Sequence, residues 1–185
     1  MATNELTQLP SLESGDAGTV GFVFVASIPL LFAAFGSWAH AKLPSSFVGF
    51  GTAASGAGNE AVIIAVLAGV LIAMAYVSLA TKQRPHYFTL LLISTVNLIT
   101  VLAAGAHARG AVAKAGRVIA NNVGPPNPPV IIGDGSAMIW CTLCAVVIEL
   151  AVLGGIGWLL LENRRQREYA RNLAYLKSKE PKRTP

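Results

Sequence analysis

The chain has 185 residues, of which 54% are hydrophobic and only 12% are charged, with a mean hydropathy of +0.57 and a formal net charge of +5. A soluble domain carries about twice that share of charged residues, so the composition excludes an ordinary soluble protein. It indicates an integral membrane protein, with no expectation of nucleic-acid binding or of a bound cofactor.

The apolar residues are concentrated in four segments, each near the roughly 20 residues that a helix needs to cross a ~30 Å hydrocarbon core. Each segment is continuously apolar, whereas the strands of a membrane barrel alternate apolar and polar side chains. The sequence therefore predicts an all-α protein with a bundle of four transmembrane helices. The expected spans are 19–39, 61–80, 87–106 and 137–161.

Lysine and arginine residues set the expected orientation, because they are enriched in cytoplasmic loops. Eight of them lie in the C-terminal tail, and the short connection between the second and third spans adds Lys82 and Arg84. Both termini are thus expected in the cytoplasm of a multi-pass protein, assigned to a bacterial plasma membrane. The expected parts are an acidic segment (1–18), a membrane domain (19–161) and a basic tail (162–185).

The first span is interpreted as a retained helix, because its leader lacks the basic residues of a signal peptide. Trp38 at its end, together with Trp140 and Trp158 in the fourth span, is expected to anchor the helices at the two membrane interfaces. The connection Lys42–Glu60 is rich in glycine, alanine and serine. It is expected to be a flexible loop.

Small residues recur every fourth position on one face of the second span, which permits close approach of a neighbouring helix. Glycines at positions 154, 155 and 157 do the same in the fourth span. The neighbour can belong to this chain or to another. The expected packing residues of the second span are Ala61, Ala65, Gly69 and Ala73.

The third span carries a polar stripe, since Ser94, Asn97 and Thr100 are three residues apart and fall within one broad face of a helix. The following stretch, His107–Asn121, is compatible with helix, so this helix is expected to protrude from the membrane or turn along its surface. The prolines within Gly124–Pro129 then favour an extended return.

Glu149 lies at the centre of the apolar run Ala137–Leu161. A charged group there costs about 2.5–3.5 kcal/mol and marks a candidate site. Asn97 is at the middle of its own span, so the two side chains are expected to meet. Three roles stay open for Glu149: an interhelical hydrogen bond that fixes packing, pairing with a basic group of a partner protein, and proton or ion translocation.

The segment Ile148–Gly155 resembles the carboxylate helix of the four-span proteolipids of rotary ATPases. The resemblance covers this one segment. The glycine-striped helices that line those rings are absent from the first and third spans, and a long basic tail is present. The proteolipid function is therefore not carried over.

Cys141 and Cys144 form a C-x-x-C pair at one end of the fourth span. This position is similar to the active site of the vitamin K epoxide reductase family of four-helix, quinone-linked thiol oxidases. The resemblance implies a thiol oxidoreductase, but the further loop cysteines of that family are missing here. The other interpretations are two structural cysteines, or metal binding, for which two cysteines supply too few ligands.

The tail carries an amphipathic pattern. Tyr169, Leu173 and Leu176 give Arg164–Lys177 an apolar edge, typical of a helix that lies on a membrane surface or docks on a partner. The basic residues are expected to attract anionic lipids at the cytoplasmic surface. Those nearest the membrane are Arg164, Arg165, Arg167 and Arg171.

No catalytic, cofactor or metal site is expected. We expect a noncatalytic accessory or stabilising subunit of a larger membrane complex, for example a lipid transporter or an energy-converting assembly, with other integral membrane proteins as partners. One alternative is a small proton- or ion-coupled transporter that uses Glu149. The other is a membrane thiol oxidoreductase that uses Cys141 and Cys144.

Overall fold

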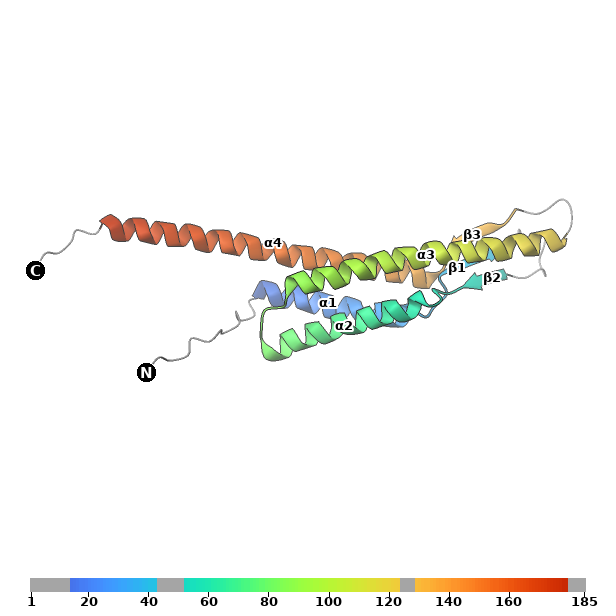
Figure 1. The fold of residues 1–185 in the computed structure, drawn as a ribbon, viewed down its shortest axis with the longest axis horizontal. Coiled ribbons are helices and arrows are strands. Elements are labelled where there is room, and N and C mark those ends of the chain that lie inside the picture. The colour runs from blue at the N-terminus through green and yellow to red at the C-terminus, as the bar shows by residue number, and fades with distance from the viewer. Residues whose placement is uncertain (1–13, 43–51, 124–128, 180–185) are drawn as a thin grey trace, which may run out of the picture.

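The computed structural model describes residues 14–42, 52–123 and 129–179. These residues form four long helices and three short strands (Figure 1). All four helices are long and apolar enough to cross a membrane, as the sequence predicts. The helices are α1 (Ser14–Ala33), α2 (Glu60–Thr81), α3 (Tyr87–Val123) and α4 (Ser136–Lys179), and the strands are β1 (Ala39–Lys42), β2 (Thr52–Ser55) and β3 (Ile131–Asp134).

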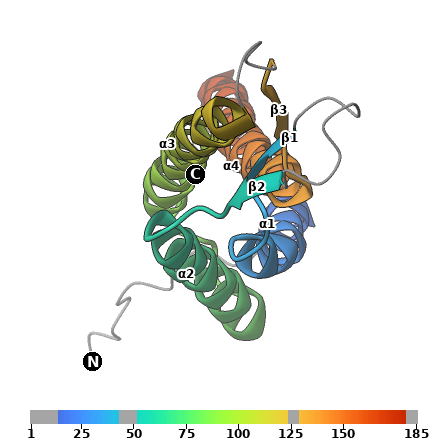
Figure 2. The same ribbon diagram turned by 90° about the vertical axis from the view of Figure 1, so that its right-hand side faces the viewer.

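The helices form an antiparallel bundle in which each one packs against its two neighbours in the ring α1–α2–α3–α4 (Figure 2). α1 begins at one end of this bundle and α4 continues beyond it, and this end is here called the terminal end (Figure 1). The strands lie at the opposite end, here called the sheet end. Apolar side chains fill the interior and also cover much of the outside, as expected where lipid is the solvent. Large buried side chains include Leu30, Ile64, Leu71, Leu90 and Ile148.

The packing face of α2 differs from the expected stripe of small residues. Of that stripe, Ala61 is buried, Ala65 and Gly69 are half-buried, and Ala73 is exposed. The helix is rotated so that Ile64 and Leu71 face the core together with other alanines, while Val62, Val66 and Val70 are exposed on the outside. The buried face consists of Ala61, Ile64, Ala68, Leu71 and Ala75.

The expectation of an all-α protein is wrong at the sheet end, where an antiparallel sheet has the order β2-β1-β3. This sheet packs on the part of α3 that extends beyond the other helices (Figure 1). Gly116 of α3 permits the close approach, because a Cβ there would meet Val130 and Ala41. β2 lies in the connection expected to be flexible, while residues 43–51 and 124–128 of the two long connections lie outside the described residues.

Trp38 joins the bundle to the sheet instead of anchoring it in an interface. It is fully buried, and its backbone N–H donates to Ser55 O at 2.9 Å. Its carbonyl accepts from Gly135 N at 2.8 Å. The expected interfacial position is therefore wrong for Trp38, whereas Trp140 and Trp158 are exposed on α4.

α4 has 44 residues and continues far beyond the other helices at the terminal end (Figure 1). Every side chain from position 163 to position 176 is exposed. Arg164 and Glu168, one turn apart, form an ion pair at 3.4 Å on this extension. The basic tail and the fourth span thus belong to one unbroken helix.

Candidate functional site

Glu149 of α4 lies against α3 and is held by two hydroxyl groups. Ser94 Oγ is 2.5 Å from Glu149 Oε2, and Thr95 Oγ1 donates to Oε1 at 2.8 Å. Interhelical hydrogen bonds in membranes contribute about 0.6 kcal/mol each, so two of them offset only part of the ~2.5–3.5 kcal/mol cost of a charge at mid-span. These residues form the candidate site, here called the polar centre.

The polar centre accommodates both protonation states of Glu149. Ser94 Oγ also lies 3.1 Å from Leu91 O, and a hydroxyl group has one proton to give and two lone pairs to accept with. When Ser94 donates to Glu149, it holds a carboxylate. When it donates to Leu91 O, it can accept the proton of a neutral carboxylic acid.

Asn97 does not bond to Glu149, contrary to expectation. Glu149 approaches α3 between Ser94 and Thr95, and at ~100° per residue the Asn97 side chain lies about 110° around the helix from that point. Asn97 is 1% exposed, and its amide nitrogen and oxygen have no hydrogen-bond partner among the described residues. Equal depth in two spans therefore did not bring the two groups together.

The predicted polar stripe is divided in the structure. Thr100 Oγ1 donates to Val96 O at 2.8 Å, a bond within its own helix turn, so Thr100 plays no part in the polar centre. Thr95 belongs to the polar centre, although it does not follow the three-residue spacing of Ser94, Asn97 and Thr100. The only signal for Thr95 in the sequence is its position next to Ser94.

Cys141 and Cys144 are free thiols in the core of the bundle. Their residues are 0% and 7% exposed, so a redox partner would reach their sulfurs only after a movement of the neighbouring helices. In the part of the chain that the structure describes, no three His, Cys, Asp or Glu side chains converge on a possible metal site.

A buried ion pair at the terminal end joins residues that no sequence pattern connects. Asp16, fully buried in the first turn of α1, bonds Arg84 Nε at 2.7 Å and accepts from the Tyr87 hydroxyl at 2.6 Å. Asp16 lies in the segment expected to precede the first span, but α1 already begins at Ser14. Breaking such a buried ion pair costs about 3–5 kcal/mol. The pair therefore stabilises the contact between α1 and the α2–α3 turn.

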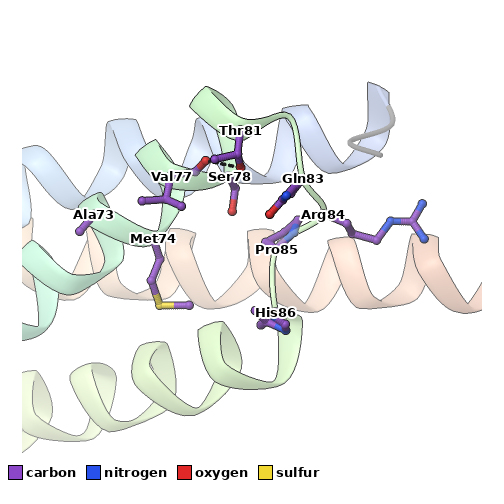
Figure 3. Close-up of a pocket in the computed structure, with 9 residues that line it drawn as sticks. All are labelled: Ala73, Met74, Val77, Ser78, Thr81, Gln83, Arg84, Pro85 and His86. Carbon is purple, nitrogen blue, oxygen red and sulfur yellow. Dashed lines mark hydrogen bonds between the residues drawn. The ribbon is translucent and has the colours of Figure 1, made fainter. Parts of the chain in front are cut away.

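A hollow of about 310 Å³ lies beside this ion pair, between the end of α2 and the α2–α3 turn (Figure 3). Arg84 is directed away from it, while Ser78 and His86 stand on opposite walls (Figure 3). Glu149 is not among its lining residues. The hollow is thus separate from the polar centre.

Comparison with known protein families, with curated proteins and with solved structures finds no match for this chain. Its class is therefore defined by its own fold. The four apolar helices indicate a multi-pass membrane protein, and a three-stranded sheet covers one end of α3.

Proposed function

We propose that the chain is a noncatalytic accessory or stabilising subunit of a larger membrane complex, for example a lipid transporter or an energy-converting assembly. The observation that carries this proposal is the exposed extension of α4. Its exposed part covers positions 163 to 176. An isolated helix of about that length is marginally stable in water unless an apolar face packs on another element. Tyr169, Leu173 and Leu176 are all exposed here, and a partner protein would bury them.

The two sides of the α4 extension differ in chemistry. At ~100° per residue, Tyr169, Leu173 and Leu176 lie within about 60° of one another and form one apolar edge. A helix that lies flat on the membrane would have to bend where it leaves the bilayer, whereas α4 runs straight on (Figure 1). Docking on a partner therefore accounts for the extension better. The arginines on the side opposite the apolar edge are Arg164, Arg167 and Arg171.

The basic residues favour a cytoplasmic position for the terminal end of the bundle, because lysine and arginine are enriched in cytoplasmic segments. We assign the protein to a bacterial plasma membrane with both termini inside. The arginines of α4 that follow the membrane, Arg165 among them, then meet anionic headgroups at about 1 kcal/mol per residue.

The polar centre supports a structural role for Glu149, since hydroxyl groups of the same chain hold both of its oxygens. A proton- or ion-coupled transporter is the second candidate. It is favoured by the ability of Ser94 to serve either protonation state of Glu149. The thiol oxidoreductase has no comparable support, because both cysteines are buried.

The test compares two full-length variants after extraction from the native membrane in a gentle detergent. One carries Tyr169→Ser, Leu173→Ser and Leu176→Ser. The matched control carries Tyr175→Ser, which removes an exposed ring outside the apolar edge. The proposal expects an integral membrane protein to co-purify at fixed stoichiometry with the control, and at least about tenfold less of it with the edge variant, which corresponds to about 1.4 kcal/mol. Equal recovery with both variants would refute docking through this edge.

A further inference from the structure

A groove of about 400 Å³ runs along the sheet-end half of α4. Its walls are mostly apolar, with the hydroxyl-bearing Thr142 among them, and at one end an arginine of α3 and an aspartate of β3 face each other. We propose that this groove binds one phospholipid with a zwitterionic headgroup: one of its two acyl chains lies along α4, and its headgroup meets the charged pair. The lining residues are Met138, Ile139, Thr142, Leu143 and Val146 of α4, with Arg109 and Asp134.

Two exposed tryptophans fix the depth of the groove in a bilayer. Trp140 and Trp158 are 56% and 45% exposed, and tryptophan is enriched at membrane interfaces. They are 18 residues apart on α4, or about 27 Å at 1.5 Å per residue, close to the ~30 Å of a hydrocarbon core. Glu149 lies midway between them. The groove residues Thr142 to Val146 thus lie within the hydrocarbon.

The charged pair lies at headgroup depth. Gly105 of α3 packs directly against Met138, so Arg109, four residues further on, lies about 9 Å beyond the level of Trp140. Headgroup layers add about 5–7 Å on each side of the hydrocarbon. Side chains on a helix lean toward its N-terminus, which for α3 is the bilayer side, so the guanidinium of Arg109 is carried back into the headgroup layer.

The charge pattern of the pair matches a zwitterion. Arg109 Nε and Nη2 bond Asp134 Oδ1 and Oδ2 at 2.6 and 2.7 Å. A guanidinium has five N–H donors and a carboxylate about four acceptor sites, so each group keeps capacity for a second partner. A phosphate can bind Arg109 while an ammonium group binds Asp134. A purely anionic headgroup would instead place negative charge beside Asp134.

Asp134 is charged at neutral pH. The hydrogen bond from Arg109 holds the pKa of Asp134 below its usual range; partial burial opposes this effect, and the positive charge of Arg109 adds to it. The carboxylate is therefore present to meet an ammonium group. Its side chain is 39% exposed and that of Arg109 is 48% exposed, so a headgroup can reach both.

The test titrates the delipidated full-length protein with lipids of identical acyl chains and counts bound lipids by native mass spectrometry. A phosphatidylethanolamine should bind at one molecule per chain. It should bind at least about tenfold more tightly than a phosphatidylglycerol, because only its ammonium group forms a charged hydrogen bond with Asp134. Equal or stronger binding of the phosphatidylglycerol, or of a diacylglycerol without phosphate, would overturn the proposal.

Variants locate the binding. Val146→Phe fills the groove and should reduce retained phosphatidylethanolamine about tenfold, whereas Val147→Phe, equally exposed but outside the lining, should not. Asp134→Asn should abolish the preference over phosphatidylglycerol. A thermal midpoint for each variant confirms that it is folded. Unchanged binding by Val146→Phe would contradict the proposal.

A photoreactive residue in place of Ile139 separates a lipid from the alternative occupant, a helix of a partner protein. In native membranes, cross-links to phospholipid support the proposal. Cross-links predominantly to a protein would overturn it. This readout is independent of the docking test on α4, because the groove and the α4 extension lie at opposite ends of the bundle.

Discussion

Glu149 is the residue whose substitution distinguishes a packing role from a transport role. In Glu149→Gln the amide oxygen can accept from Thr95 and the amide N–H can donate to Ser94, so α3 and α4 stay joined. Glu149→Leu removes both bonds and should cost about 1 kcal/mol, from ~0.6 kcal/mol for each interhelical bond. Thermal unfolding in detergent measures both variants, and the glutamine variant should match the parent in stability and in biological activity.

The opposite outcome for Glu149→Gln has a clear meaning, because an amide cannot release a proton. A glutamine variant that folds and assembles normally but has lost the biological activity would contradict the packing role. It would move the proton- or ion-coupled transporter to first place.

Asn97 gives a second prediction at the level of single residues. Its amide is buried without a hydrogen-bond partner among the described residues, and such a group costs about 1–3 kcal/mol. Asn97→Leu, whose side chain has the same branched shape without polar atoms, should therefore stabilise the bundle by roughly 1 kcal/mol, seen as a higher unfolding midpoint. A drop in the midpoint, or a loss of activity at unchanged stability, would show that Asn97 has a working partner in the assembled protein.

At the level of the structural elements, the junction between β3 and α4 leaves no room for a side chain at Gly135. A Cβ on Gly135 would collide with the backbone of Ser37 and Trp38, and the Gly135 N–H donates to Trp38 O. Gly135→Ala should thus destabilise the protein by several kcal/mol or prevent folding, since overpacking against backbone costs about 1–3 kcal/mol before the lost hydrogen bond is counted.

Gly110 is the matched control for Gly135. It is exposed within α3, and nothing lies within 4 Å of a Cβ built there. Gly110→Ala should raise stability by about 0.5–1 kcal/mol, the ordinary difference between glycine and alanine inside a helix. Equal effects of the two substitutions on the unfolding midpoint would contradict the tight junction between the sheet and α4.

The whole molecule has an orientation that thiol labelling can measure. Single cysteines at Ser55 and Ile131 should react with an impermeant reagent added to intact cells, and those at Gln83 and Ser178 should not. Ile131 is preferred to Gly133 because a Cβ at Gly133 would meet His40. Labelling of position 178 from outside would reverse the cytoplasmic assignment of the terminal end.

Much of the helical architecture is readable from the sequence, because a bilayer requires about 20 consecutive apolar residues for each span. The continuation of α3 past residue 106 also follows from its helix-compatible composition. The sheet could not be predicted, since each strand has four residues and is defined by pairing between distant connections. The Asp16–Arg84 ion pair could not be predicted for the same reason, because its two residues are 68 positions apart in the sequence.

The candidate site was only partly predictable. Glu149 can be identified from the sequence alone, because a carboxyl group at the middle of a membrane span has a high free-energy cost. Its partners depend on the rotation of α3 about its own axis, which residue spacing does not determine, so Thr95 was missed and Asn97 was wrongly paired with Glu149. Rotation of α2 likewise decided which of its small residues face the core.

The central claim is that this chain acts as a subunit of a larger membrane assembly, and the mass of the native particle tests it most directly. Native mass spectrometry would be applied to the chain extracted gently from its own membrane. The claim predicts particles well above the 19.3 kDa of one chain that contain a different integral membrane protein at fixed stoichiometry. Particles made of this chain alone, which move protons or ions when reconstituted in vesicles, would contradict it.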